Sequence, residues 1–141
     1  MTLLRRMLSI LTMRWLAAGN ANAADNGSGH FRKGEHGVDV RHAIAVLRER
    51  SLDPAEDEIL VYLSDQPLDA MKAAATFDPD DSVREQYSDR SGGYVQVCIT
   101  ADGGECGLFY LHRDPSDSFN TSGYGELKLD TQTRDRIAGR W

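Results

Sequence analysis

The sequence predicts a single α+β domain: two or three N-terminal helices packed on a small antiparallel meander sheet of about four strands, with a short C-terminal helix. Residues 38–78 show helical spacing and helix-start signals. Residues 94–112 instead alternate with the period of a strand around a glycine-rich turn. Helices grouped before strands, without strict alternation, are typical of α+β folds.

The first predicted helix covers residues 38–50. Its apolar side chains recur at i, i+3, i+4 and i+7, which places them on one helix face: Val40, Ala43, Ile44 and Leu47. A second helix is expected from Asp53, because Asp53-Pro54-Ala55-Glu56 supplies a cap, a first-turn proline and a glutamate three residues after the cap. The apolar run 59–63 that follows is also compatible with a buried strand, and the cap favours the helix.

A third helix is expected from Pro67 to just before Pro79, because alanines raise its helix propensity. Strands follow at 83–87, 94–100, 107–112 and 126–130. Asp102-Gly103-Gly104 supplies the turn between the second and third of these strands. A last helix at 131–140 would carry Ile137 inward.

The N-terminal part differs from the rest in composition. Residues 1–23 combine Arg5-Arg6, an apolar stretch and Ala21-Asn22-Ala23, the three parts of a secretory signal peptide, although Arg14 interrupts the apolar part. A basic, disordered segment without a targeting role is the alternative. Residues 24–37 contain four glycines and one large apolar side chain, which is typical of a linker. The domain is therefore expected at 38–141.

Charge excludes several function classes. Residues 1–50 carry eight basic and four acidic residues, and residues 51–141 carry eight basic and eighteen acidic ones. A body this acidic repels phosphate backbones, so we expect no nucleic-acid partner. No stretch reaches the roughly 18 to 20 apolar residues that span a bilayer. The expected partner is another protein.

The state of Cys98 and Cys106 depends on the hairpin register. A loop with an odd number of residues, centred on Asp102, places the two cysteines opposite each other and permits a disulfide. A two-residue Gly103-Gly104 turn points them to opposite sides and leaves two reduced thiols. Closing so short a loop would stabilise the fold by about 2.5 kcal/mol. Both alternatives stay open, because the disulfide depends on export.

Metal and cofactor sites are not expected. The cysteines are not arranged as a CxxC pair, and the spacing of His30, His36 and His42 does not place two of them on one helix face. The catalytic candidates are His112 and Asp114, with no spacing that singles out an acid–base pair.

A binding patch is the other candidate site. In the odd-loop register Tyr94 and Tyr110 are neighbours on one sheet face, with Gln96 beside them. The alternative is that this face packs under the helices.

These observations favour a small non-enzymatic interaction protein of bacterial type, exported to the periplasm or secreted, whose acidic surface suits a basic partner or keeps the protein in solution. One alternative is a cytoplasmic accessory protein with reduced cysteines. Another is a small hydrolase that uses His112 and a carboxylate.

Overall fold

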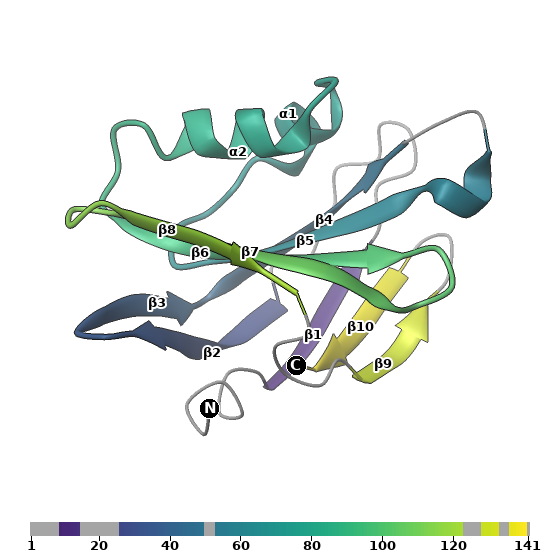
Figure 1. The fold of residues 1–141 in the computed structure, drawn as a ribbon, viewed down its shortest axis with the longest axis horizontal. Coiled ribbons are helices and arrows are strands. Elements are labelled where there is room, and N and C mark those ends of the chain that lie inside the picture. Colours follow the sequence, from purple (N-terminus) through teal and green to yellow (C-terminus); the bar gives the residue numbers. More distant parts are fainter. Residues whose placement is uncertain (1–8, 15–25, 50–52, 123–127, 133–135, 141) are drawn as a thin grey trace.

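The protein is mostly β, with two short helices (Figure 1). The computed structural model describes residues 9–14, 26–49, 53–122, 128–132 and 136–140. Strands make up most of these residues, so the prediction of helices packed on a small meander sheet is wrong.

A five-stranded antiparallel meander forms the centre of the molecule, in the order β4-β5-β6-β7-β8. Its strands are β4 (His42–Arg48), β5 (Glu58–Ser64), β6 (Gly92–Thr100), β7 (Glu105–Arg113) and β8 (Asp117–Thr121). The hairpin predicted around 102–104 is therefore present as β6 and β7.

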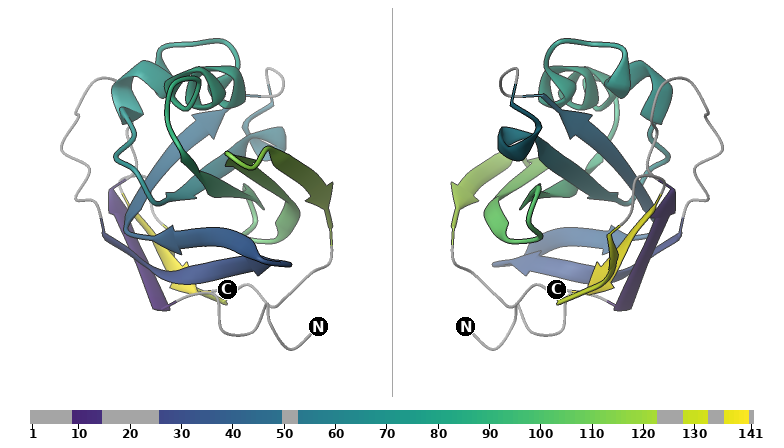
Figure 2. Two further views of the ribbon diagram at one scale, coloured as in Figure 1. Left: turned by 90° about the vertical axis from the view of Figure 1, so that its left-hand side faces the viewer. Right: turned by 90° about the vertical axis from the view of Figure 1, so that its right-hand side faces the viewer.

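A second sheet lies against one face of this meander (Figure 2). Its order is β3-β2-β1-β10-β9, with β1 at Ser9–Arg14, β2 at Asn26–Lys33, β3 at His36–Val40, β9 at Lys128–Gln132 and β10 at Arg136–Arg140. Strands β1 and β2 pack on β4, and β3 packs on β5 and β6. The two sheets form a β-sandwich.

The opposite face of the meander carries the helices (Figures 1 and 2). These are α1 (Ala70–Ala74) and α2 (Pro79–Gln86), which pack on each other. Asp78 caps α2 by accepting a hydrogen bond from the backbone N–H of Asp80, and Pro79 occupies the first turn. We call α1, α2 and the connecting residues 75–78 the helical layer.

Burial on both faces explains the central strands. Residues 43–46 of β4 and 59–63 of β5 are almost without solvent exposure, because the second sheet covers one face and the helical layer the other. A strand buried on both faces is continuously apolar and loses the alternation that would identify it.

Five predicted elements were wrong in type. The helix expected at 38–50 is the end of β3 followed by β4, and the helix expected after Asp53 is a single 3-10 turn, Pro54–Glu56, followed by β5. The strand expected at 83–87 belongs mostly to α2. In place of the C-terminal helix, 136–140 is β10, and residues 133–135 lie outside the described residues.

The fifth wrong prediction is the linker expected at 24–37. From residue 26 onward it forms β2, the following turn and the start of β3, and Phe31 is fully buried. Its glycines include Gly34, whose φ of 63° lies in the turn between β2 and β3. Folded structure therefore begins ahead of Val38.

Among the described residues, no helix has the length and apolar character needed to cross a bilayer.

Candidate functional site

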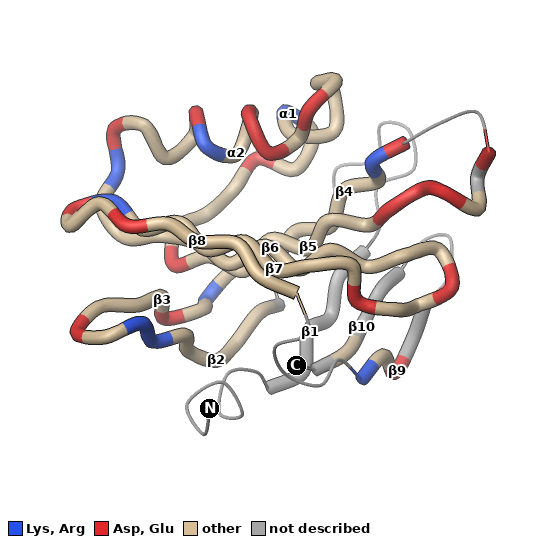
Figure 3. The backbone as a smooth tube through the Cα atoms, in the orientation of Figure 1, with Lys and Arg blue, Asp and Glu red and all other residues tan. Residues whose placement is uncertain are grey.

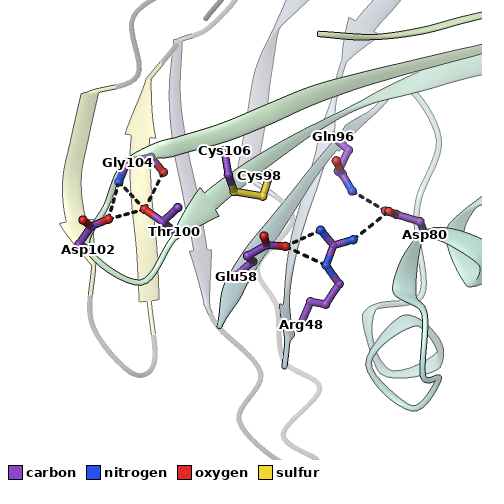
Figure 4. The surroundings of a disulfide bond; sticks show 9 residues. All are labelled: Arg48, Glu58, Asp80, Gln96, Cys98, Thr100, Asp102, Gly104 and Cys106. Carbon is purple, nitrogen blue, oxygen red and sulfur yellow. Dashed lines mark hydrogen bonds and ion pairs between the residues drawn. A yellow bond between two sulfur atoms is a disulfide. The ribbon is translucent and has the colours of Figure 1, made fainter. Parts of the chain in front are cut away.

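A disulfide joins Cys98 of β6 to Cys106 of β7, with their Cα atoms 5.0 Å apart (Figure 4). Cys98 pairs with Gly107 and Ile99 with Glu105, so Cys106 is the extra residue of a β-bulge. Next to the turn, the pairing of Ile99 with Glu105 is the odd-loop register centred on Asp102, which confirms the alternative that permits the disulfide; beyond the bulge the register is shifted by one residue. The bulge brings Cys106 beside Cys98 without direct pairing.

An ion pair lies next to this disulfide (Figure 4). Glu58 of β5 pairs with Thr100, two residues from Cys98 on the same face. Oε2 of Glu58 accepts hydrogen bonds from Nε of Arg48 at 3.0 Å and from the Arg48 NH2 group. Burial alone would lower the pKa of Arg48, but the hydrogen bond to Glu58 and the charges of Glu58 and Asp80 outweigh it and raise that pKa. Arg48 is thus held as a cation.

Asp80 extends this network to the helical layer. Its Oδ1 accepts hydrogen bonds from the Tyr62 hydroxyl and the Gln96 amide, and its Oδ2 accepts one from Arg48 at 3.3 Å. Burial, followed by the negative charge of Asp80, raises the pKa of Tyr62, so that the phenol stays protonated and donates. Asp80 lies in the first turn of α2, so the network ties this helix to β4, β5 and β6.

The register of β6 and β7 separates the expected binding residues Tyr94 and Tyr110. Tyr94 pairs with Leu111 and Val95 with Tyr110, so Tyr94 and Tyr110 lie on opposite faces of the meander. Tyr94 and Gln96 are buried under the helical layer, and Tyr110 is buried against Phe31 of the second sheet, with ring centroids 4.9 Å apart. Burial raises the pKa of Tyr110 to about 12. These side chains build the core on both faces.

The two catalytic candidates, His112 and Asp114, differ in burial. His112 is 7% exposed, and its Nδ1 lies 2.8 Å from the carbonyl oxygen of Pro115. Asp114 is exposed in the β7–β8 turn. Among the described residues, no ion pair or hydrogen bond joins His112 to a carboxylate.

A polar cluster near His112 was missed by the sequence analysis. Asp117 at the start of β8 accepts two hydrogen bonds from Lys33 Nζ, at 2.7 and 2.6 Å, and lies 3.1 Å from Nε2 of His36. The His36 ring stacks at a tilt against His112, with centroids 4.9 Å apart. The hydrogen bond from Lys33, and then that from His36, lowers the pKa of Asp117. Lys33 and His36 lie in the stretch predicted as a linker, and no local sequence signal pairs them with Asp117.

In the described part of the chain, the exposed large apolar side chains belong to the helical layer. Phe77 is fully exposed (103%) and Met71 is half exposed (48%). Thr76 fixes the turn that presents Phe77, because its hydroxyl lies 3.0 Å from the carbonyl oxygens of both Ala73 and Asp78. The single helix predicted from Pro67 to just before Pro79 gives Phe77 no special position.

Acidic residues are frequent along the helices and their flanking segments (Figure 3). Residues 65–89 contain seven acidic and two basic residues. Asp69, Asp81 and Glu85 are exposed on the helices and their flanks.

The chain matches no protein-family model, no curated protein and no solved structure.

Proposed function

We propose that this protein is a small non-enzymatic interaction protein that binds a basic, partly apolar protein segment on its helical layer. The observation that carries the proposal is the complete exposure of Phe77 in an acidic layer. Burying a phenylalanine side chain stabilises a complex by about 2 kcal/mol, and the surrounding carboxylates attract lysine and arginine.

The short helices suit such a role. Asp69, Asp78 and Thr76 satisfy backbone groups at the ends of α1 and α2, and the Asp80 network anchors α2 to the sheet. A partner would therefore meet a prearranged surface, which lowers the entropic cost of binding.

The first prediction concerns contact at Phe77. A photo-crosslinking amino acid placed at position 77 of the full chain, expressed in its native host, should form a covalent adduct with one protein on irradiation. The control places the same group at Glu35, which is exposed in the β2–β3 turn away from the helical layer. The adduct should disappear when Asp81→Lys and Glu85→Lys are added, because a basic segment would be repelled. Equal adducts from positions 77 and 35, or an adduct that survives charge reversal, would contradict the proposal.

Export to an oxidising compartment is part of the proposal. The Cys98–Cys106 disulfide supports it, because disulfides persist in the periplasm and outside the cell and are rare in a reducing cytoplasm. Cleavage before Ala24 would remove β1 from between β2 and β10. The exported protein would then keep the complete central meander and the helical layer.

The second prediction concerns processing. Intact mass of the natively expressed protein should begin at Ala24, and the thiols should react with an alkylating agent only after reduction. A full-length mass with two freely alkylated thiols would contradict export and support the cytoplasmic alternative.

A further inference from the structure

Three strands bring sulfur and carboxylate atoms together at one end of the meander (Figure 4). Glu58 is on β5, Cys98 on β6 and Cys106 on β7. One ligand atom from each of the three lies within 4.8 Å of the others. The set is independent of the helical-layer surface, so the inference below does not rest on the proposed binding function.

We propose that the reduced protein binds one thiophilic divalent cation, of the Zn²⁺ class, through Cys98 Sγ, Cys106 Sγ and a carboxylate oxygen of Glu58. Thiolate and carboxylate groups are among the ligands of Zn²⁺, and three protein ligands leave one tetrahedral position for water.

The distances fit a tetrahedral ion. Metal–sulfur bonds of about 2.3 Å and a metal–oxygen bond of about 2.0 Å require the ligand atoms to lie roughly 3.5 to 3.8 Å apart. The three ligand atoms lie within 4.8 Å of one another in the oxidised protein, and once the disulfide is broken the two sulfurs can move apart to the required separation by side-chain rotation. The Cα atoms of the cysteines, 5.0 Å apart, are held by the flanking strand pairs and need no rearrangement.

The local charge also fits. Two thiolates and the Glu58 carboxylate carry three negative charges, and a divalent cation together with the Arg48 guanidinium, which also pairs with Asp80, offsets most of them. Arg48 donates two hydrogen bonds to Oε2 of Glu58 and one to Oδ2 of Asp80.

The site exists only after reduction. A dithiol reductant donates two electrons and two protons, the Cys98–Cys106 bond breaks, and the reductant leaves as its own cyclic disulfide. The cation then replaces the two thiol protons, which pass to solvent. Oxidation reverses both steps and releases the cation, so metal binding reports the redox state of the compartment.

Cobalt titration of the full chain tests this proposal. The protein is reduced with a phosphine in the absence of oxygen and titrated with Co²⁺, which gives a thiolate-to-metal charge-transfer band when bound by cysteine. We expect one Co²⁺ per reduced chain, displaced by Zn²⁺, and no band in the oxidised protein. Far-ultraviolet circular dichroism of the same samples follows the strands.

Variants separate a three-ligand site from adventitious thiol binding. Cys98→Ser should abolish the band, and Glu58→Gln should weaken Co²⁺ binding at least about tenfold, the scale of losing a group that orders a metal site. The matched control is Glu56→Gln, which changes an exposed carboxylate two residues away and should leave affinity unchanged. Equal affinity of the Glu58→Gln and Glu56→Gln proteins would overturn the proposal, whether or not the reduced chain keeps its strands. The absence of a band in reduced protein, or its presence in oxidised protein, would also overturn it.

Discussion

Asp80 joins the helical layer to three strands of the meander through one side chain. It lies in the first turn of α2, yet its hydrogen bonds reach Tyr62 on β5, Gln96 on β6 and Arg48 on β4. A carboxylate that accepts from a phenol, an amide and a guanidinium satisfies three donors that the helical layer would otherwise bury. Asp80 therefore acts as a structural link between two layers.

Asp80→Asn should destabilise the protein by about 2 kcal/mol, the loss expected when hydrogen bonds to a partly buried charge are broken. The amide offers one acceptor and places donors against the donors of Arg48 or Gln96. The control is Asp81→Asn, whose carboxylate is 73% exposed and pairs only within the helix with Arg84. It should change stability by less than about 0.5 kcal/mol. Urea unfolding of both variants measures the difference, and equal midpoints would show that the Asp80 network contributes nothing.

At the scale of elements, the strands of the hairpin were predictable and the central strands were not. Residues 94–100 and 107–112 carry a local alternation or a turn signal, and β6 and β7 include both ranges. The spacing of Ala43, Ile44 and Leu47 also fits a helix face, but residues 43–46 are buried on both sides as part of β4. The spacing of apolar residues alone cannot distinguish one face of a helix from a strand that is buried on both sides, because tertiary burial decides which of the two forms.

Capping signals show the same dependence on context. Asp53-Pro54 and Asp78-Pro79 are equivalent helix starts by sequence, and each aspartate accepts a hydrogen bond from the N–H two residues on. The first gives only the 3-10 turn, because the apolar run after it enters the core as β5. The second starts α2, in which the polar residues other than Ser82 keep some exposure to solvent. A cap marks where a helix can start, and the following residues decide its length.

Gly92 fixes the path from the helical layer into β6. Its φ of 88° lies in the left-handed region, and an added Cβ would collide with the carboxylate of Asp65. Oδ2 of Asp65 accepts a hydrogen bond from the N–H of Gly93 at 3.0 Å, and Oδ1 accepts one from the Tyr87 hydroxyl at 2.8 Å. A side chain at residue 92 therefore disturbs both the backbone and these bonds.

Gly92→Ala should cost about 3 kcal/mol, the sum of left-handed strain and the displaced aspartate. The control is Gly34→Ala, which has a φ of 63° but nothing within 4 Å of its added Cβ. It carries the strain alone, about 1 kcal/mol. Thermal unfolding of the two variants should rank them in that order, and a Gly34 variant at least as unstable as the Gly92 variant would contradict the assigned role of Asp65.

At the scale of the whole molecule, the packing of one sheet on the other lay beyond sequence reasoning. Phe31 was the only large apolar side chain in a glycine-rich stretch, and it packs on Tyr110 almost 80 residues later. The candidate site depends on the same kind of information. The disulfide was among the sequence alternatives, but the bulge at Cys106 and the approach of Glu58 follow from strand pairing across β5, β6 and β7.

The contact of Asp117 with Lys33 and His36 ties the two sheets together, because β8 belongs to the meander and β2 and β3 to the second sheet. The pKa of Asp117 is lowered in the folded protein, so its contribution to stability is fully present above the ordinary value of 3.8. It is lost as the pH falls through the lowered folded pKa.

Asp117→Asn should therefore lower the melting temperature at pH 7, and the difference in melting temperature from the unaltered protein should shrink as the pH falls below about 4 and the carboxylate becomes protonated. The control is Asp39→Asn, which removes a carboxylate that is 66% exposed and lies 4.0 Å from Arg32 within the same β2–β3 hairpin. The melting temperature of that variant should differ little from that of the unaltered protein at pH 2 and at pH 7, since an exposed ion pair contributes little to stability. Melting curves of the three proteins from pH 2 to pH 7 test this predicted pH dependence. A deficit of Asp117→Asn that persists at pH 2 would mean that residue 117 acts by packing, as the neighbouring Phe31, Tyr110 and Phe119 rings do, and not through its charge.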